Sequence, residues 1–209
     1  MGSFEGKAAF KTVLWSDSAI AGEAVRLAIG LVMLGTGSSA LLEDMVQHAH
    51  ETQHEKIIRG LAIGMALIRF EKQEATDDLI NILLDEVDPT LRYGGIMTIA
   101  MANCGTGSNK AIRQLLHVAV SAVNDDIGRV SLMSLRFILF RKPNAVPRIV
   151  ELLSESYNPH VRYGTSLALG ISYAGTGLDK AIDLLEPMIK NPTDLVGQGA
   201  LISMAMIRV

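Results

Sequence analysis

The segment His50-Glu51-Thr52-Gln53-His54 has the residue types and spacing of a zinc hydrolase motif. Two histidines four positions apart on one helix can bind the same zinc ion, and the glutamate between them can activate a water molecule. Glu71 or Glu74 could supply a third ligand. However, the repeat described below places this segment at a polar link between two helices. The sequence therefore favours a chance match on a solvated surface, and a zinc metallopeptidase is the remote alternative.

Three Gly-Thr-Gly triplets, at positions 35–37, 105–107 and 175–177, could cradle a phosphate group. A dinucleotide-binding loop needs a preceding strand and a third glycine, and a P-loop needs Gly-Lys followed by Ser or Thr. Residues 105–110 read Gly-Thr-Gly-Ser-Asn-Lys after a predicted helix. The triplets are therefore predicted to be turns. Cys104 has no evident His or acid partner and is predicted to be a small core residue.

The composition excludes several classes of protein. One Cys among 209 residues rules out a disulfide framework and a Cys-based zinc module. The net charge of -3, without a basic run, argues against nucleic acid or a membrane surface as the main partner. Three uncharged runs, at 27–42, 93–109 and 163–178, are too short to span a membrane and are expected to be buried helices. The start does not resemble a secretory signal, which indicates the cytosol or nucleus.

An internal repeat of about 35 residues organises the chain. The Gly-Thr-Gly triplets are 70 residues apart, and Leu91-Arg92-Tyr93-Gly94 returns at the same offset as Val161-Arg162-Tyr163-Gly164. Weaker copies lie halfway between these. The repeat predicts a solenoid over residues 21–209, with five repeats and the first helix of a sixth. Residues 1–20 are expected to be a partial helix or a cloning remnant.

Each repeat is predicted to contain two helices. In the fifth repeat, residues 160–173 are apolar nearly all round, which is typical of a buried inner helix. Residues 178–189 combine apolar and polar positions with a helical period, which is typical of a half-exposed outer helix. The chain is 49% hydrophobic but only 5% aromatic, which suits closely packed helices. The predicted fold class is therefore all-α, an α/α solenoid.

Glycine has two predicted structural roles. The triplet glycines are expected to end inner helices in the left-handed conformation, so that Gly175→Val would cost about 1–2 kcal/mol. Other glycines lie inside inner helices and are expected to allow close approach between neighbouring backbones. The turn glycines are Gly35, Gly37, Gly105, Gly107, Gly175 and Gly177, and the packing glycines are Gly30, Gly64, Gly94, Gly164, Gly170 and Gly199.

Arg92 and Arg162 occupy equivalent positions near the starts of two inner helices. A positive charge there opposes the helix dipole, so a specific inter-repeat partner is expected, such as Glu155 or Asp125, with a solvated arginine as the alternative. A methionine stripe is expected to pack in the core, with an adaptable binding surface as the alternative. Its members are Met97, Met101, Met133, Met204 and Met206.

The repeat that combines Arg-Tyr-Gly, Ala-x-Gly, Gly-Thr-Gly and Lys-Ala-Ile resembles the proteasome/cyclosome repeat, and stretches at 17–24, 51–61, 115–126 and 152–164 carry the same resemblance. The resemblance implies a non-catalytic scaffold in the base of the 26S proteasome regulatory particle, in the cytoplasm and nucleus. It implies repeats that form the curved wall of a toroid and contact the ATPase ring, the lid and ubiquitin receptors. It also implies no catalytic residue, cofactor or metal.

Departures from the pattern limit the expected regularity. Arg69-Phe70-Glu71-Lys72 stands where the second repeat would have its triplet, and Pro143 stands there in the fourth. The sixth repeat stops after its first helix, which leaves Leu201 and Ile202 without a covering helix and predicts self-association or a frayed end. A free-standing solenoid adaptor of the transport type remains an alternative function, and it would be a stable monomer with a continuous concave groove.

Overall fold

The computed structural model describes residues 18–121, 124–140, 150–151 and 153–209. Across these residues the chain forms α-helices and one short 3-10 helix, without a strand, which confirms the predicted all-α fold. None of the described helices has the length and hydropathy needed to cross a membrane. The chain divides into two compact units, Met1–Ala102 and Asn103–Val209, and each is described by itself.

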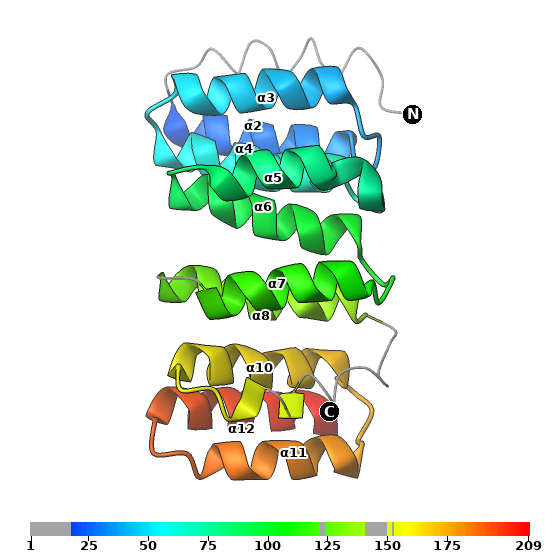
Figure 1. Cartoon of the computed structure of the whole chain (residues 1–209), viewed down its shortest axis with the longest axis vertical. Helices are drawn as coiled ribbons and strands as arrows, with labels where there is room; N and C mark the ends of the chain where they lie inside the picture. The colour runs from blue at the N-terminus through cyan, green and yellow to red at the C-terminus, as the bar shows by residue number, and fades with distance from the viewer. Residues whose placement is uncertain (1–17, 122–123, 141–149, 152) are drawn as a thin grey trace. The chain divides into compact units, whose positions relative to one another are not determined.

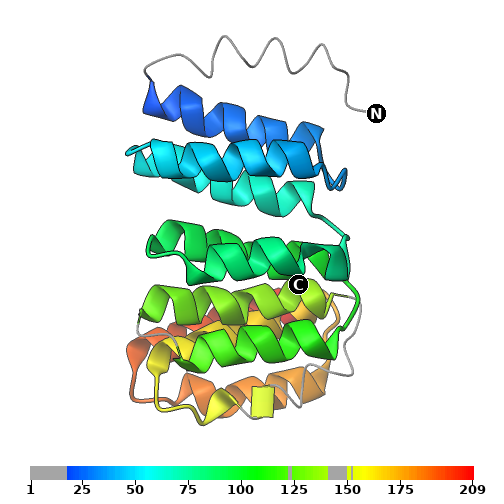
Figure 2. The ribbon, with the colours of Figure 1, turned by 45° about the horizontal axis from the view of Figure 1, so that its top comes forward.

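The first unit contains two rows of helices. Its elements are α2 (Ala19–Val32), α3 (Ser39–Glu51), α4 (Glu55–Ile68), η1 (Gln73–Thr76), α5 (Asp77–Asp85) and α6 (Pro89–Ala102). The inner helices α2, α4 and α6 pack one against the next, and the outer helices α3 and α5 pack on the inner helix that follows each of them. Figures 1 and 2 show these helices side by side. The unit therefore has the inner and outer layers that the repeat predicts.

The second unit is built in the same way. Its elements are α7 (Asn109–Ser121), α8 (Asp125–Ile138), α10 (Pro159–Ser172), α11 (Asp179–Ile189) and α12 (Asp194–Arg208). The inner helices α8, α10 and α12 pack in sequence, α7 packs on α8, and α11 packs on α12. The helices predicted over 160–173 and 178–189 are α10 and α11, and their ends differ from the prediction by at most one residue.

Polar residues at the links start the inner helices. The Asn158 side chain accepts a hydrogen bond from the His160 N–H at 2.8 Å, and Pro159 occupies the first turn of α10. The Asn124 side chain caps α8 in the same way, through the Asp126 N–H at 2.8 Å. These caps satisfy amides that have no partner within the helix, and proline at this position loses nothing because its missing N–H would be unpaired.

The core of each unit lies between its inner and outer helices. Leu61 and Met65 of α4 pack with Leu42 of α3 and Leu83 of α5 in the first unit. In the second unit the Leu and Ile side chains that are at most 1% exposed are Leu115, Leu132, Leu135, Ile138, Leu169, Leu185 and Ile207. Replacing any one of these residues with Ala would leave a cavity, which typically lowers the free energy of unfolding by about 2–5 kcal/mol.

The predicted core packing of the methionine stripe is wrong. Met97, Met101, Met133 and Met204 are only half-buried, and Met206 is 37% exposed. Their chain neighbours take the buried positions instead: Ile96 and Thr98 flank Met97, Leu132 and Ser134 flank Met133, and Ser203 precedes Met204. The methionines that do reach full burial are Met45, Met65 and Met188.

Candidate docking surface

The three Gly-Thr-Gly turns share one backbone geometry. Their six glycines have φ between 59° and 70°, in the left-handed region that favours glycine. In each turn the threonine hydroxyl donates to the carbonyl three residues earlier: Thr36 to Met33 at 2.8 Å, Thr106 to Asn103 at 2.7 Å and Thr176 to Tyr173 at 2.6 Å. The threonine therefore holds the turn closed, while the glycines set its direction.

Each turn also holds the end of the next inner helix. The Gly35 N–H donates to the Leu67 carbonyl at 3.1 Å and the Gly37 N–H donates to the Ile68 carbonyl at 3.0 Å, at the end of α4. Equivalent bonds join Gly105 and Gly107 to Phe137 and Ile138 (2.8 and 3.0 Å), and Gly175 and Gly177 to Met206 and Ile207 (2.9 and 2.8 Å). The last carbonyls of a helix have no partner within it, so the turn of one repeat caps the inner helix of the next. We call each such set of hydrogen bonds a clasp.

The second repeat makes a clasp without glycine. The Glu71 N–H donates to the Met101 carbonyl at 3.1 Å, at the end of α6. Glu71 has φ 59° and Gln73 has φ 45°, so two residues with side chains adopt the conformation that glycine adopts elsewhere. This conformation costs a non-glycine residue about 1–2 kcal/mol. The hydrogen bond from the turn to the next inner helix is thus present even where a non-glycine residue must adopt positive φ to donate it. Pro143, in the fourth turn, lies outside the described residues.

Glycines inside the inner helices lie where neighbouring helices leave little room for a side chain. A Cβ added at Gly30 would be 2.6 Å from the Gly64 Cα, and one added at Gly170 would be 2.6 Å from the Ser203 Cα. For a Cβ added at each of the others, the nearest atom would be Arg26 O at 2.8 Å for Gly64, Ala62 Cβ at 2.8 Å for Gly94, Leu132 Cβ at 3.1 Å for Gly164 and Tyr163 Cδ2 at 2.6 Å for Gly199. These glycines therefore set the spacing of the inner row.

The arginine near the start of α10 does not contact the expected acids. Arg162 Nη1 donates to the carbonyls of Ser156 and Tyr157, the latter at 3.0 Å, and Nη2 donates to Thr193 Oγ1 at 3.4 Å. Thr193 is the N-cap of α12, so the guanidinium spans two links. The prediction that Arg162 contacts Glu155 or Asp125 is wrong. The guanidinium donates instead to backbone carbonyls of the link that precedes α10.

The equivalent residue in the first unit makes fewer polar contacts. The Arg92 backbone N–H donates to the Asp88 carbonyl at 3.1 Å, as part of the first turn of α6. Its side-chain Nε is buried without a hydrogen-bond acceptor among the described residues. Asp125 is engaged elsewhere, by Asn158 Nδ2 at 3.0 Å and by His160 Nε2 at 3.7 Å. The two arginines therefore do not make equivalent polar contacts.

A buried arginine in α2 was not predicted from the sequence. Arg26 is 2% exposed, and its guanidinium donates to the Gly22 carbonyl at 2.8 Å and to His48 Nε2 at 2.7 Å. Arginine has no acceptor, so the His48 ring must be neutral at Nε2 to accept this bond. Burial, and then the charge of Arg26, lower the pKa of His48. The one sequence clue was a charged residue inside an apolar helix.

The zinc-like motif is divided between two helices. His50 and Glu51 end α3, whereas His54 is the N-cap of α4, so the histidines do not share a helical face. His50 Nε2 instead pairs with Glu86 Oε1 at 2.7 Å. Among the residues that the structure describes, no group of three His, Cys, Asp or Glu side chains could hold a metal ion. Glu71 and Glu74 lie in and beside the second clasp, and they complete no such group.

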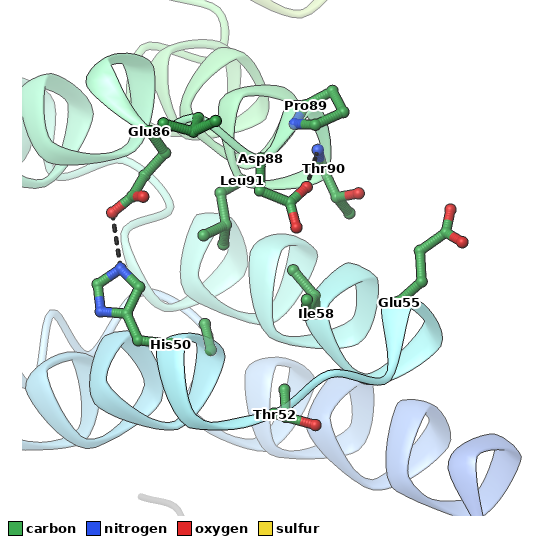
Figure 3. A pocket seen from close by; sticks show the side chains of 11 residues that line it. His50, Thr52, Glu55, Ile58, Glu86, Asp88, Pro89, Thr90 and Leu91 are labelled. Atoms are coloured by element: carbon green, nitrogen blue, oxygen red, sulfur yellow. Dashed lines mark hydrogen bonds and ion pairs between the residues drawn. The ribbon is translucent and has the colours of Figure 1, made fainter.

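A groove of about 630 Å³ lies between two links of the first unit. Its floor is apolar, formed by Ala49, Ile58 and Leu91, which are at most 7% exposed. Its rim is polar and acidic. Figure 3 shows the His50–Glu86 pair at one end and the Glu55 carboxylate toward the other. The full lining is Ala49, His50, Thr52, Glu55, Ile58, Glu86, Val87, Asp88, Pro89, Thr90 and Leu91.

The link between α5 and α6 contributes Val87 and Asp88 to the lining of this groove. Asp88 Oδ1 accepts from the Thr90 N–H at 2.7 Å, which caps α6. Val87 precedes this cap and is 90% exposed. The groove was missed in the sequence because its residues come from two links that lie about 36 positions apart, the separation of His50 and Glu86.

Comparison with known proteins accounts for the repeat. Residues 27–58 and 164–198 match the family model described as Proteasome/cyclosome repeat. The 26S proteasome non-ATPase regulatory subunit 1 of Drosophila melanogaster is 57% identical over 197 residues, which are 94% of this chain and 19% of the relative. Its homolog B in Arabidopsis thaliana is 56% identical over 199 residues, 95% of this chain and 20% of the relative.

A fungal relative gives the same result. The 26S proteasome regulatory subunit rpn2 of Schizosaccharomyces pombe is 53% identical over 197 residues, which are 94% of this chain and 20% of the relative. The chain therefore spans about a fifth of the length of these curated relatives. The inner and outer helices and the clasps are consistent with the match of residues 27–58 and 164–198 to the proteasome/cyclosome repeat model.

Proposed function

We propose that this chain is a scaffold segment of the base of the 26S proteasome regulatory particle. The observation that supports this most directly is 57% identity over 94% of the chain to a proteasome regulatory subunit. Because the alignment covers 94% of the chain, it spans inner helices, clasps and links alike. The segment needs no catalytic group, cofactor or metal to perform such a role.

The fold supports a scaffold role through rigidity. Packing glycines bring α2 and α4 into backbone contact, and clasps attach the described turns to the repeat that follows each of them. Backbone contacts of this kind leave little room for one helix to shift against the next. The segment would form a curved part of a toroid in the cytoplasm and nucleus. Its links and outer helices would face the ATPase ring, the lid and ubiquitin receptors, without nucleic acid or membrane partners.

Affinity purification of the native full-length protein tests this proposal. We expect ATPase subunits, lid subunits and ubiquitin receptors to co-purify in fixed proportion, and none of them with a tagged, unrelated α-solenoid. A full-length protein that purifies as a monomer with transported cargo would support the adaptor alternative instead. Stoichiometric zinc, together with hydrolase activity lost in Glu51→Gln, would support the metallopeptidase alternative.

We also propose that the isolated 209-residue chain self-associates through α12. Leu201 and Ile202 are 55% and 48% exposed on this helix, and Met206 adds to the same apolar surface. Sedimentation equilibrium should show a dimer that Leu201→Glu converts to a monomer, because a buried unpaired charge opposes association. The matched variant Asp183→Lys on α11 should leave the dimer unchanged. A wild-type monomer at all concentrations would contradict this expectation.

A further inference from the structure

Two links present a large apolar side chain to solvent at equivalent positions. Val87 directly precedes Asp88-Pro89, and Tyr157 directly precedes Asn158-Pro159, 70 residues later. Val87 is 90% exposed and Tyr157 is 102% exposed. A single exposed hydrophobic residue is ordinary. The same full exposure at the same position of two repeats indicates that this position is used for contact.

The backbone that carries these side chains is held in place. In the first unit, Asp88 caps α6 and the preceding Glu86 pairs with His50 at 2.7 Å. In the second unit, Asn158 caps α10 and the Tyr157 carbonyl accepts from Arg162 Nη1 at 3.0 Å. A side chain on a fixed link loses little conformational entropy when a partner covers it.

The groove beside Val87 indicates what such a partner carries. Its buried floor of Ala49, Ile58 and Leu91 suits an aliphatic side chain. Three carboxylates, from Glu55, Glu86 and Asp88, lie in its lining, whereas the only basic group there, His50, is paired with Glu86. The carboxylate of Glu55 makes no direct hydrogen bond or ion pair within the described part of the chain, and the charge nearby on its own helix is that of Arg59. The groove therefore complements positive charge on either side of an apolar centre.

We propose that this groove, with Val87 at its edge, docks a segment of a partner protein in which lysine or arginine flanks an aliphatic side chain. The aliphatic group covers Val87 and the apolar floor, and the cations face Glu55 and Asp88. This inference rests on the scaffold function proposed above and names the partner chemistry at one place on the scaffold.

A peptide titration tests the proposal on the 209-residue chain. The probe is the capped peptide Gly-Lys-Leu-Lys-Gly, followed by chemical shifts of the isotope-labelled protein. We expect saturable binding with a Kd below about 1 mM, with shifts confined to the groove lining. The capped peptide Gly-Glu-Leu-Glu-Gly should cause no saturable shift. Raising the salt concentration should weaken binding of the lysine peptide.

Variants locate the binding site. Glu55→Lys and Val87→Ser change exposed side chains and should each weaken the lysine peptide about fivefold. Asp183→Lys changes the net charge as Glu55→Lys does, but on α11 of the second unit, and should leave the affinity unchanged. Unaltered thermal unfolding midpoints would show that all three variants remain folded.

Several results would overturn the proposal. They are absence of saturable binding, equal binding of the two peptides, or an equal loss of affinity in Asp183→Lys. Self-association of the chain that Val87→Ser abolishes, but Leu201→Glu does not, would identify a second copy as the occupant and also overturn it. If the peptide fails to bind while proteasome subunits still co-purify with the full-length protein, the docking inference is wrong and the scaffold function stands.

Discussion

Gly30 and Gly175 lie in regions with opposite surroundings. A Cβ added at Gly30, inside α2, would be 2.6 Å from the Gly64 Cα, but a Cβ added at Gly175 would meet nothing within 4 Å. Gly175 instead has φ 70°, in the turn that clasps α12. Lack of space excludes a side chain at Gly30 in the helix, whereas the positive φ of the backbone disfavours a side chain at Gly175 in the turn. The same residue type therefore serves packing at one place and chain direction at the other.

Gly30→Ala should have the largest effect. The added methyl group would meet backbone of α4, which cannot rotate away, so the two helices would have to separate. We expect a loss of about 3 kcal/mol in the free energy of unfolding, at the upper end of the usual range for overpacking. Urea unfolding of the 209-residue chain, followed by circular dichroism, measures this. Gly175→Ala adds the same methyl group in open space, and an equal loss there would contradict the distinction.

Gly175→Val should have the next largest effect, although the site is open. A β-branched residue at positive φ is strained, so we expect a loss of about 1–2 kcal/mol by the same measurement. Gly175→Asn should recover most of that loss, because asparagine tolerates the left-handed region better than other residues. Equal stability of the Val and Asn variants would show that conformation is not the reason for this glycine.

Glu71→Gly should stabilise the chain. It relieves positive φ at a clasp that lacks glycine, partly offset by the greater flexibility of glycine in the unfolded chain. We expect a gain of up to about 1 kcal/mol in the free energy of unfolding. Glu74→Gly in the adjoining η1 is the matched control, because Glu74 itself does not have a positive φ, and this variant should be destabilising. A loss in both variants would mean that Glu71 is not strained.

The smallest effect we expect depends on pH and concerns the contact between Arg26 and His48. Burial and the Arg26 charge hold the pKa of His48 below 6.5, the value that applies to the unfolded chain. As pH falls through this value, the unfolded chain takes up the proton first. The stability that the neutral ring contributes is therefore complete above about pH 6.5 and is lost as the pH approaches the folded-state pKa.

The variant His48→Gln isolates this effect. Glutamine keeps an acceptor for Arg26 but does not titrate. We expect the wild type to lose more unfolding free energy than His48→Gln between about pH 7 and pH 5. The packing at Gly30 does not titrate, so it should contribute equally in both proteins. Parallel pH profiles would contradict the assignment.

The sequence was most informative where one residue type recurs with the repeat. The inner and outer helices, their polar caps and the turns follow from local chemistry, because a helical period and a capping Asn-Pro act over a few residues. The boundaries of α10 and α11 were predicted to within one residue for this reason.

Contacts between repeats could not be predicted in the same detail. The Gly35 N–H donates to the Leu67 carbonyl, but neither residue type indicates that these two positions are paired. Arg162 found link carbonyls rather than an acid, because the distance between side chain and backbone depends on how two helices cross. The groove beside Val87 forms only where two links that are distant in sequence come together in the folded chain. Such features depend on packing, which a repeat pattern restricts but does not specify.

The clasps run in one direction along the chain. In each of them the donating turn precedes the accepting helix in sequence, as Gly35 and Gly37 precede Leu67 and Ile68. During translation the amide groups therefore leave the ribosome before the carbonyls that satisfy them. The amides of a described turn therefore cannot reach their carbonyl acceptors until the following inner helix has been synthesised.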